Sequence, residues 1–236
     1  MKHDFSDYLE PEEARAIINH VGKVSKHPER DTLLIEMLWQ TGARVSEAIQ
    51  LTQGGILSTS LILRNLKQRK PLRDFRGGYR GKVVHNVSGK PIMMADVKAT
   101  KNVEVSKSLC DDLREFCLVN NIRRGEYVFQ GNRNPIPHIY LNRYYVWWIV
   151  GKASEALKIN KVGKRDPRIK VEREGKPAYP HLFRHATGMY LLEQTADLDL
   201  VRQHLGHANI STTQVYAYTK RGVIKKKIAE LDWGEK

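Results

Sequence analysis

The sequence has little cysteine, no long hydrophobic run and fewer acidic than basic residues. Its two cysteines, Cys110 and Cys117, belong to no Cys-x-x-Cys pair or His/Cys cluster, so we expect reduced packing residues and no metal site. The densest apolar stretch, YYVWWIV at 144–150, is far shorter than the ~20 residues that span a bilayer. The charged N-terminus MKHDFSDYLEPEEARA lacks the apolar segment of a signal peptide. These absences predict a cytoplasmic protein with no membrane or metal partner.

The excess of basic residues indicates a polyanionic partner. Lys and Arg number 40 against 26 Asp and Glu, which leaves a formal net charge of +14. Basic side chains on phosphates release condensed counterions, so nucleic acid is the first candidate and an anionic membrane surface the second. Two segments, 64–82 and 158–176, hold eight Lys and Arg each. From them we select the candidate DNA contacts Arg64, Arg69, Lys70, Lys164, Arg165 and Arg168.

Hydrophobic periodicity predicts a mostly helical chain. A helix begins at Pro11 in PEEARAIINHVGKV, and a second, in DTLLIEMLWQTG, has Asp31 as its cap and ends at Gly42. Further helices are expected in SLCDDLREFCLVNN and HIYLNRYYVWWIVGKASEALK, and three more segments follow Pro180. We interpret the aromatic run at 144–148 as packing in preference to base stacking.

Two extended stretches interrupt the helices. Segments 60–70 and 101–107 are predicted strands, separated by a Gly- and Arg-rich insertion at about 71–98, and a basic loop covers 158–179. The expected fold class is therefore α+β, mostly α-helical with a small antiparallel sheet. We expect one domain over 1–236 with a C-terminal tail at 220–236.

Three short motifs carry polar residues at defined spacings. His181 and Arg184 are three apart in YPHLFRHATGMYLLE, so they share a helix face and can donate hydrogen bonds to one phosphate. Arg44 comes shortly after a glycine that ends a helix in QTGARVSEAIQLT, which places Arg44 in a turn. The alternative is that Arg44 is an ordinary surface arginine paired with Glu47. In the stretch DLDLVRQHLGHANISTTQVYAY, Gly206 is predicted to end one helix before another begins, a pattern that also fits a helix-turn-helix DNA reader.

Together these motifs resemble the catalytic domain of the tyrosine recombinase (phage-type integrase) family. The family's Gly-x-Arg-x-x-Glu box is matched by Gly42, Arg44 and Glu47, and its His-x-x-Arg box by His181 and Arg184. Its Leu-Gly-His box is matched at 205–207. The likeness covers about residues 10 to 230 and implies the DNA breaking-rejoining fold of that family.

The resemblance also assigns roles. The family's nucleophilic tyrosine follows nine residues after the Leu-Gly-His histidine, which selects Tyr216 and not Tyr218, a residue about 200° away around a helix. Arg44, His181, Arg184 and His207 would surround the phosphate, and a hairpin lysine would protonate the leaving oxygen. Lys67 is the first candidate for that lysine, with Lys70 and Lys101 as alternatives.

The implied activity is site-specific recombination through a covalent 3′-phosphotyrosine intermediate, with integration, excision, inversion or resolution of a DNA element as the outcome. The covalent bond conserves the phosphodiester energy, so we expect no cofactor. Two duplexes imply a homotetramer on DNA, monomeric without it. Hardly ten residues precede the first helix, so we expect no separate N-terminal core-binding domain, which leaves a place for accessory DNA-binding proteins. The alternatives are a non-catalytic DNA-binding regulator on the same fold and a type IB topoisomerase-like activity.

Overall fold

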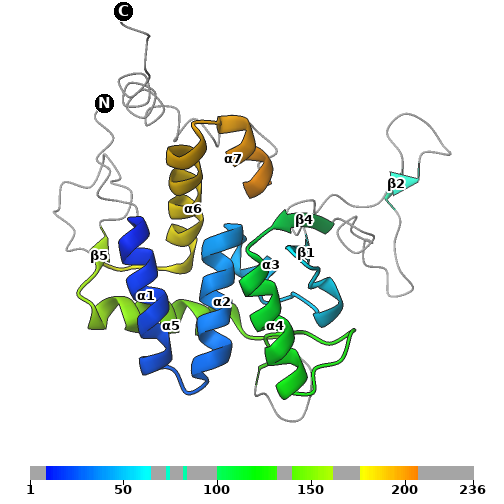
Figure 1. Cartoon of the computed structure of the whole chain (residues 1–236), viewed down its shortest axis with the longest axis horizontal. Helices are drawn as coiled ribbons and strands as arrows, with labels where there is room; N and C mark the ends of the chain where they lie inside the picture. Colours follow the sequence, from blue (N-terminus) through cyan, green and yellow to red (C-terminus); the bar gives the residue numbers. More distant parts are fainter. Residues whose placement is uncertain are drawn as a thin grey trace, which may run out of the picture.

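Helix α2 (Pro28–Thr41) is the centre of the fold. The computed structural model describes residues 9–64, 100–131, 140–161 and 176–206, and the backbone of 73–74 and 82–83. Within this part of the chain α2 contacts α1, α3, α4 and α6 (Figure 1). It takes the centre because apolar residues surround its axis on several sides, and all of these are buried: Leu34, Ile35, Met37, Leu38 and Trp39.

Helix α1 (Pro11–Val24) lies antiparallel beside α2 (Figure 1). It begins at Pro11 as predicted, because proline is suited to the first helical position. The same preference makes our predicted start of α2 wrong. Pro28 takes its first turn, the N-cap is His27, and Asp31 lies inside the helix with its side chain buried. The Asp31 carboxylate instead accepts hydrogen bonds from Ser25 and Tyr145.

The predicted small sheet is present and antiparallel. Strand β1 (Ser60–Arg64) pairs with β4 (Thr100–Glu104), and Leu63 lies opposite Lys101. Leu61 and Leu63 face the core while Ile62 and Arg64 are exposed, as the period of two requires. Short helix α3 (Val45–Ala48) and the 3-10 turn η2 (Gln53–Gly55) lead into β1, and α4 (Lys107–Val119) follows β4.

Short strand pairs lie in the two basic segments. Strand β2 (Arg73–Asp74) pairs with β3 (Lys82–Val83), and β5 (Asn160–Lys161) pairs with β6 (Lys176–Pro177). We predicted only a loop over 158–179. The β5–β6 pair shows that this loop starts and ends as a hairpin, with 162–175 outside the described residues.

Three helices complete the described chain: α5 (Arg143–Ala156), α6 (Pro180–Thr195) and α7 (Leu198–Leu205). Helix α5 is shorter than predicted because the Asn142 side chain caps it by accepting from the Tyr144 amide. Helix α7 ends, as predicted, at Gly206, whose φ is 65°. The third helical segment expected after Pro180 lies outside the described residues.

The observed fold confirms the predicted class, mostly helical with a small antiparallel sheet. One main apolar core contains residues from each of the helices α1 through α6. A smaller cluster of Leu192, Val201 and Leu205 lies between α6 and α7. Both cysteines are buried and free, and burial raises the pKa of the Cys117 thiol to about 11. None of the described helices is long and apolar enough to cross a membrane.

Candidate active site

Arg184 is a buried arginine at the point where α2, α6 and α7 meet. Arg184 is only 3% exposed to solvent. One terminal nitrogen donates to the Gly42 carbonyl at 2.6 Å and the other to the Leu205 carbonyl at 2.7 Å. One turn later on α6, the Thr187 hydroxyl donates to the Trp39 carbonyl at 2.6 Å. The guanidinium is therefore held rigidly by the C-terminal ends of two helices.

A buried carboxylate lies next to this junction and pairs with two cations. Glu47 on α3 has a side chain that is 1% exposed. Its Oε1 lies 2.8 Å from a terminal nitrogen of Arg44, and its Oε2 lies 3.3 Å from Nζ of Lys101. The Arg44 amide also donates to Glu47 at 3.2 Å. The predicted alternative, in which Arg44 pairs with Glu47, is thus observed, but the pair is part of a cluster.

The pKa shifts show that these groups act on one another. Burial alone would raise the pKa of Glu47, but Lys101 and Arg44 outweigh it and hold that pKa below the usual value. Burial lowers the pKa of Lys101; Glu47 opposes this, while Arg184 and Arg44 add to it, and the pKa is lowered overall. Arg44 and Lys101 therefore pair with one carboxylate, and Arg184 lies close enough to lower the pKa of Lys101.

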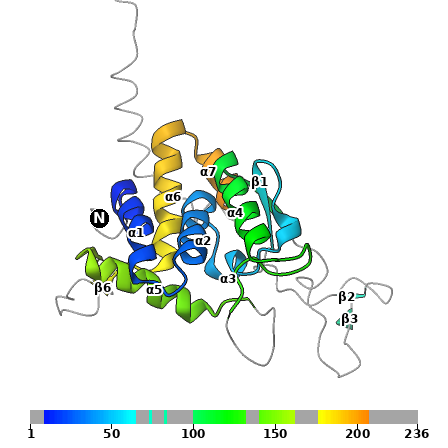
Figure 2. The ribbon, with the colours of Figure 1, turned by 60° about the horizontal axis from the view of Figure 1, so that its bottom comes forward.

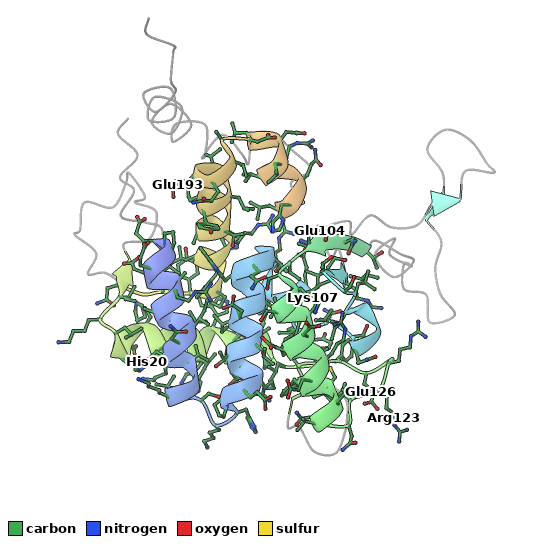
Figure 3. All side chains as sticks on the ribbon, in the orientation of Figure 1. His20, Glu104, Lys107, Arg123, Glu126 and Glu193 are labelled. Atoms are coloured by element: carbon green, nitrogen blue, oxygen red, sulfur yellow. The ribbon has the colours of Figure 1, made fainter. Side chains whose placement is uncertain are left out.

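Helix α7 is fastened to this cluster by His204. The His204 Nε2 lies 2.9 Å from the Gln40 carbonyl, and the Gln40 side chain accepts from the Ser106 amide at 2.9 Å. Burial lowers the pKa of His204, and Lys101 and Arg184 lower it further against the opposing effects of Gln40 and Glu104. Figure 3 labels Glu104 at the end of β4, where that strand approaches α7. These contacts join α7, α2 and the β4–α4 junction.

His181 lies in the first turn of α6, with its side chain exposed. Its ring contacts that of His185, with centroids 4.9 Å apart and planes perpendicular. The predicted pairing of His181 and Arg184 on one face is only partly observed, because Arg184 turns into the α2–α7 junction while His181 stays at the surface. The pair thus offers one buried and one accessible donor.

Of the predicted catalytic residues, Arg44, His181 and Arg184 lie on the elements that meet here. Lys67, His207 and Tyr216 lie outside the described residues, and so do Arg69, Lys70, Lys164, Arg165 and Arg168. Arg64 is exposed at the end of β1, and its guanidinium lies 3.4 Å from the Gln50 side-chain oxygen. Within the described ranges, no three His, Cys, Asp or Glu side chains group as metal ligands.

The sequence did not point to a role for Gln40 or for His204. Both act through contacts between residues more than 60 positions apart. Lys101 was only an alternative candidate, because the insertion before it hides its register. The β1–β4 pairing resolves that register, and a Cβ added at Gly206 would lie 3.6 Å from Cδ of Lys101.

Comparison with known proteins gives one family. The model of the phage integrase family matches residues 7–221. The tyrosine recombinase XerD of Staphylococcus saprophyticus is 27% identical over 225 residues, which are 95% of this chain and 62% of the relative. The tyrosine recombinase XerC of Bacillus subtilis is 27% identical over 199 residues, 83% of this chain and 51% of the relative. The chain thus spans less than two thirds of the length of these relatives.

Solved structures show the same fold. The XerH site-specific recombinase bound to its difH substrate has a TM-score of 0.59 at 18% identity, over 89% of this chain and 50% of that one. The XerA recombinase has a TM-score of 0.61 at 17% identity, over 94% of this chain and 64% of that one. At such identities the likeness carries the fold alone.

Proposed function

Because the chain belongs to the phage integrase family, we propose that it is a site-specific DNA recombinase that cuts and rejoins strands through a 3′-phosphotyrosine intermediate. Relatives named tyrosine recombinases support the proposal. Double-stranded DNA is the proposed substrate, in line with the net charge of +14. A homotetramer on two DNA sites is the proposed assembly, since two duplexes present four strands to be cut.

The observation that carries this proposal is the pairing of Arg44 and Lys101 with the buried carboxylate of Glu47, with Arg184 close enough to act on Lys101. Like charges brought together at a partly buried site repel one another unless an anion joins them. A phosphodiester supplies that anion, and its charge deepens when a nucleophile approaches. Donors already held in place, as Arg184 is by two carbonyls, stabilise such charge without reorganising.

The proposed reaction is attack by the Tyr216 hydroxyl oxygen on the scissile phosphorus. A bond forms between that oxygen and phosphorus, the bond to the 5′-oxygen breaks, and the 5′-hydroxyl leaves with a proton. A free tyrosine has a pKa near ~10 and is mostly protonated at neutral pH. The cationic cluster would lower that pKa, and a histidine, His181 or His207, would accept the proton. A 5′-hydroxyl from another strand then reverses the step.

Two lysines compete as the donor of the leaving-group proton. Lys67 stays a prediction, because it lies outside the described residues. Lys101 ion-pairs with Glu47 at the cluster, and its lowered pKa favours proton release. We expect Lys101→Met to reduce cleavage by about 10²-fold or more, the usual contribution of a general acid.

A DNA with sulfur in place of the bridging 5′-oxygen separates the two lysines. Its thiolate leaves without a proton, so this DNA should restore cleavage by Lys101→Met if Lys101 is the donor. Lys67→Met is the matched comparison. If this DNA restores cleavage by Lys67→Met but not by Lys101→Met, Lys67 is the proton donor.

The nucleophile is tested by covalent trapping. We would incubate the protein with a pool of nicked duplexes of random sequence, denature it and sequence the DNA that stays attached. The nick lets the cleaved fragment diffuse away, so the adduct accumulates. We expect an adduct with the wild type and with Tyr218→Phe, and at least a thousandfold less with Tyr216→Phe.

An unchanged adduct in Tyr216→Phe would exclude that residue as the nucleophile. A wild-type protein that binds the pool but forms no adduct would be a DNA-binding regulator instead.

A further inference from the structure

Helix α5 presents an aromatic face to solvent. Tyr144 is 66% exposed, Trp147 49% and Trp148 48%, whereas the apolar residues between them are buried: Val146, Ile149 and Val150. Our expectation that the run 144–148 serves packing holds only in part: the rings of Trp147 and Trp148 contact those of Tyr179 and Tyr145, but both residues stay about half exposed. Large aromatic side chains gathered at the surface mark a site of interaction.

A glycine interrupts the same face of the helix. At 100° per residue, Gly151 lies between Trp147 and Tyr144 in angle, one to two turns further along. A Cβ added at Gly151 would meet nothing within 4 Å. No contact in the described structure therefore requires glycine there, although glycine is less favourable than alanine inside a helix. The close approach of a partner supplies a reason for it.

This face is continuous with the candidate active site. Helix α5 contacts both α3 and α6, and it runs along the lower edge of the ribbon in Figure 2. The Trp147 ring stacks on that of Tyr179, with centroids 5.0 Å apart and planes within 12°. Tyr179 caps α6 and precedes His181 by two residues. A duplex held at the active site would therefore pass beside α5.

The chemistry of the face matches base edges better than phosphates. Its rings offer broad apolar surface and few hydrogen-bond donors, while a basic side chain, Arg143, lies at its edge with its guanidinium 5.0 Å from the Tyr144 ring centre. In the major groove, which admits a helix, the thymine C5-methyl is the apolar feature that distinguishes bases. We propose that the α5 aromatic face (Tyr144, Trp147, Trp148 and Gly151) lies in the major groove and selects thymine through that methyl group.

The inference rests on the proposed DNA binding, so its test begins with a binding site. A pool of random 30-base-pair duplexes is enriched on the wild-type protein, and uracil then replaces each thymine of the enriched site singly. We expect at least one replacement to weaken binding by about fourfold, the effect of one buried methyl group. In Trp148→Ala or Tyr144→Ala the same replacement should have no effect.

Two further variants separate recognition from folding. Tyr190→Ala removes a tyrosine of α6 that is 40% exposed and should keep the thymine dependence of the wild type. Gly151→Ala should raise the resistance to urea, because alanine favours the helix, and should weaken binding to the enriched site at least fivefold. A merely structural glycine would show the first effect without the second.

The outcomes separate this inference from the proposed function. If no duplex is bound at low salt, the DNA-binding function itself is wrong. If an enriched site binds equally well with thymine or uracil at every position, the inference fails and DNA binding stands. The inference also fails if Trp148→Ala only converts an oligomer to a monomer in sedimentation, because the face would then bind a second copy of the chain.

Discussion

At the scale of single residues, Glu47 controls the charge of the candidate active site. Its carboxylate is the anion that both Arg44 and Lys101 contact. It raises the pKa of Lys101 against the larger effect of burial, and it holds Arg44 through two hydrogen bonds. Glu47 therefore sets both the position of one cation and the protonation of the other.

We expect Glu47→Gln to lower the pKa of Lys101 further, because the carboxylate that favours the charged ammonium is lost while burial remains. The alkaline loss of any activity that needs protonated Lys101 should then begin at a lower pH. Loss of one partner of a buried ion pair should also reduce the free energy of unfolding by about 3 kcal/mol. The Lys101 titration is measured by NMR of its Cε carbon, and the stability by urea denaturation.

Glu155→Gln is the control for the titration, since Glu155 on α5 pairs with Lys152 away from the site. An unchanged titration of Lys101 in Glu47→Gln would show that the carboxylate does not control it.

At the scale of elements, the meeting of α2, α6 and α7 depends on the backbone at the end of α2. Gly42 has a φ of 55°, a left-handed conformation that favours glycine, and its carbonyl accepts from Arg184. A Cβ at this position would overlap Cδ2 of Leu205, the last residue of α7. The turn therefore permits α7 to approach and orients the acceptor that holds Arg184.

Gly42→Ala should lower the free energy of unfolding by about 2–3 kcal/mol. Strain at a positive φ accounts for about 1–2 kcal/mol, and displacement of Leu205 from its packed position accounts for the rest. Urea denaturation measures the change. Gly22→Ala in α1 is the control, because a Cβ there would make only ordinary contacts, at 3.4 and 3.6 Å. Equal stability of the two variants would show that α7 does not depend on this close approach.

At the scale of the whole molecule, the charge distribution favours a long anionic partner. The net charge is +14, and the two most basic segments contain the strand pairs β2–β3 and β5–β6, at separate places in the chain. Arg64, at the end of β1, leads into the first of them and is exposed. Such a surface attracts DNA largely independently of its sequence, so that recognition of a particular site requires contacts with the bases.

Arg64→Ala should weaken DNA binding about equally on all sequences. If Arg64 contacts one phosphate, the slope of log affinity against log salt should fall in magnitude by about 0.9. Binding is measured by fluorescence anisotropy at several salt concentrations. Arg15→Ala is the control, because Arg15 lies on α1, on the opposite side of the molecule from β1 (Figure 1). Equal slopes for the wild type and Arg64→Ala would exclude this phosphate contact.

Local patterns predicted the parts of the fold that local physics governs. The apolar period in 11–24 and the proline at its start were sufficient for α1, and Gly42 and Gly206 marked two helix ends correctly. Asp31 was misassigned, because its partner Tyr145 lies 114 residues away. The exposure of Trp147 and Trp148 could not be predicted from the sequence either, since an aromatic residue in a helix can face the core or the solvent.

The sequence by itself determined the fold class and the motifs around Arg44 and Arg184, because helix periods and short spacings are local properties. Only the tertiary structure decided that Lys101 reaches Glu47, that Gly42 and Leu205 together hold Arg184, and that α5 turns its aromatic residues outward. These contacts join residues far apart in the chain. Their geometry depends on how whole helices pack, which no local pattern specifies.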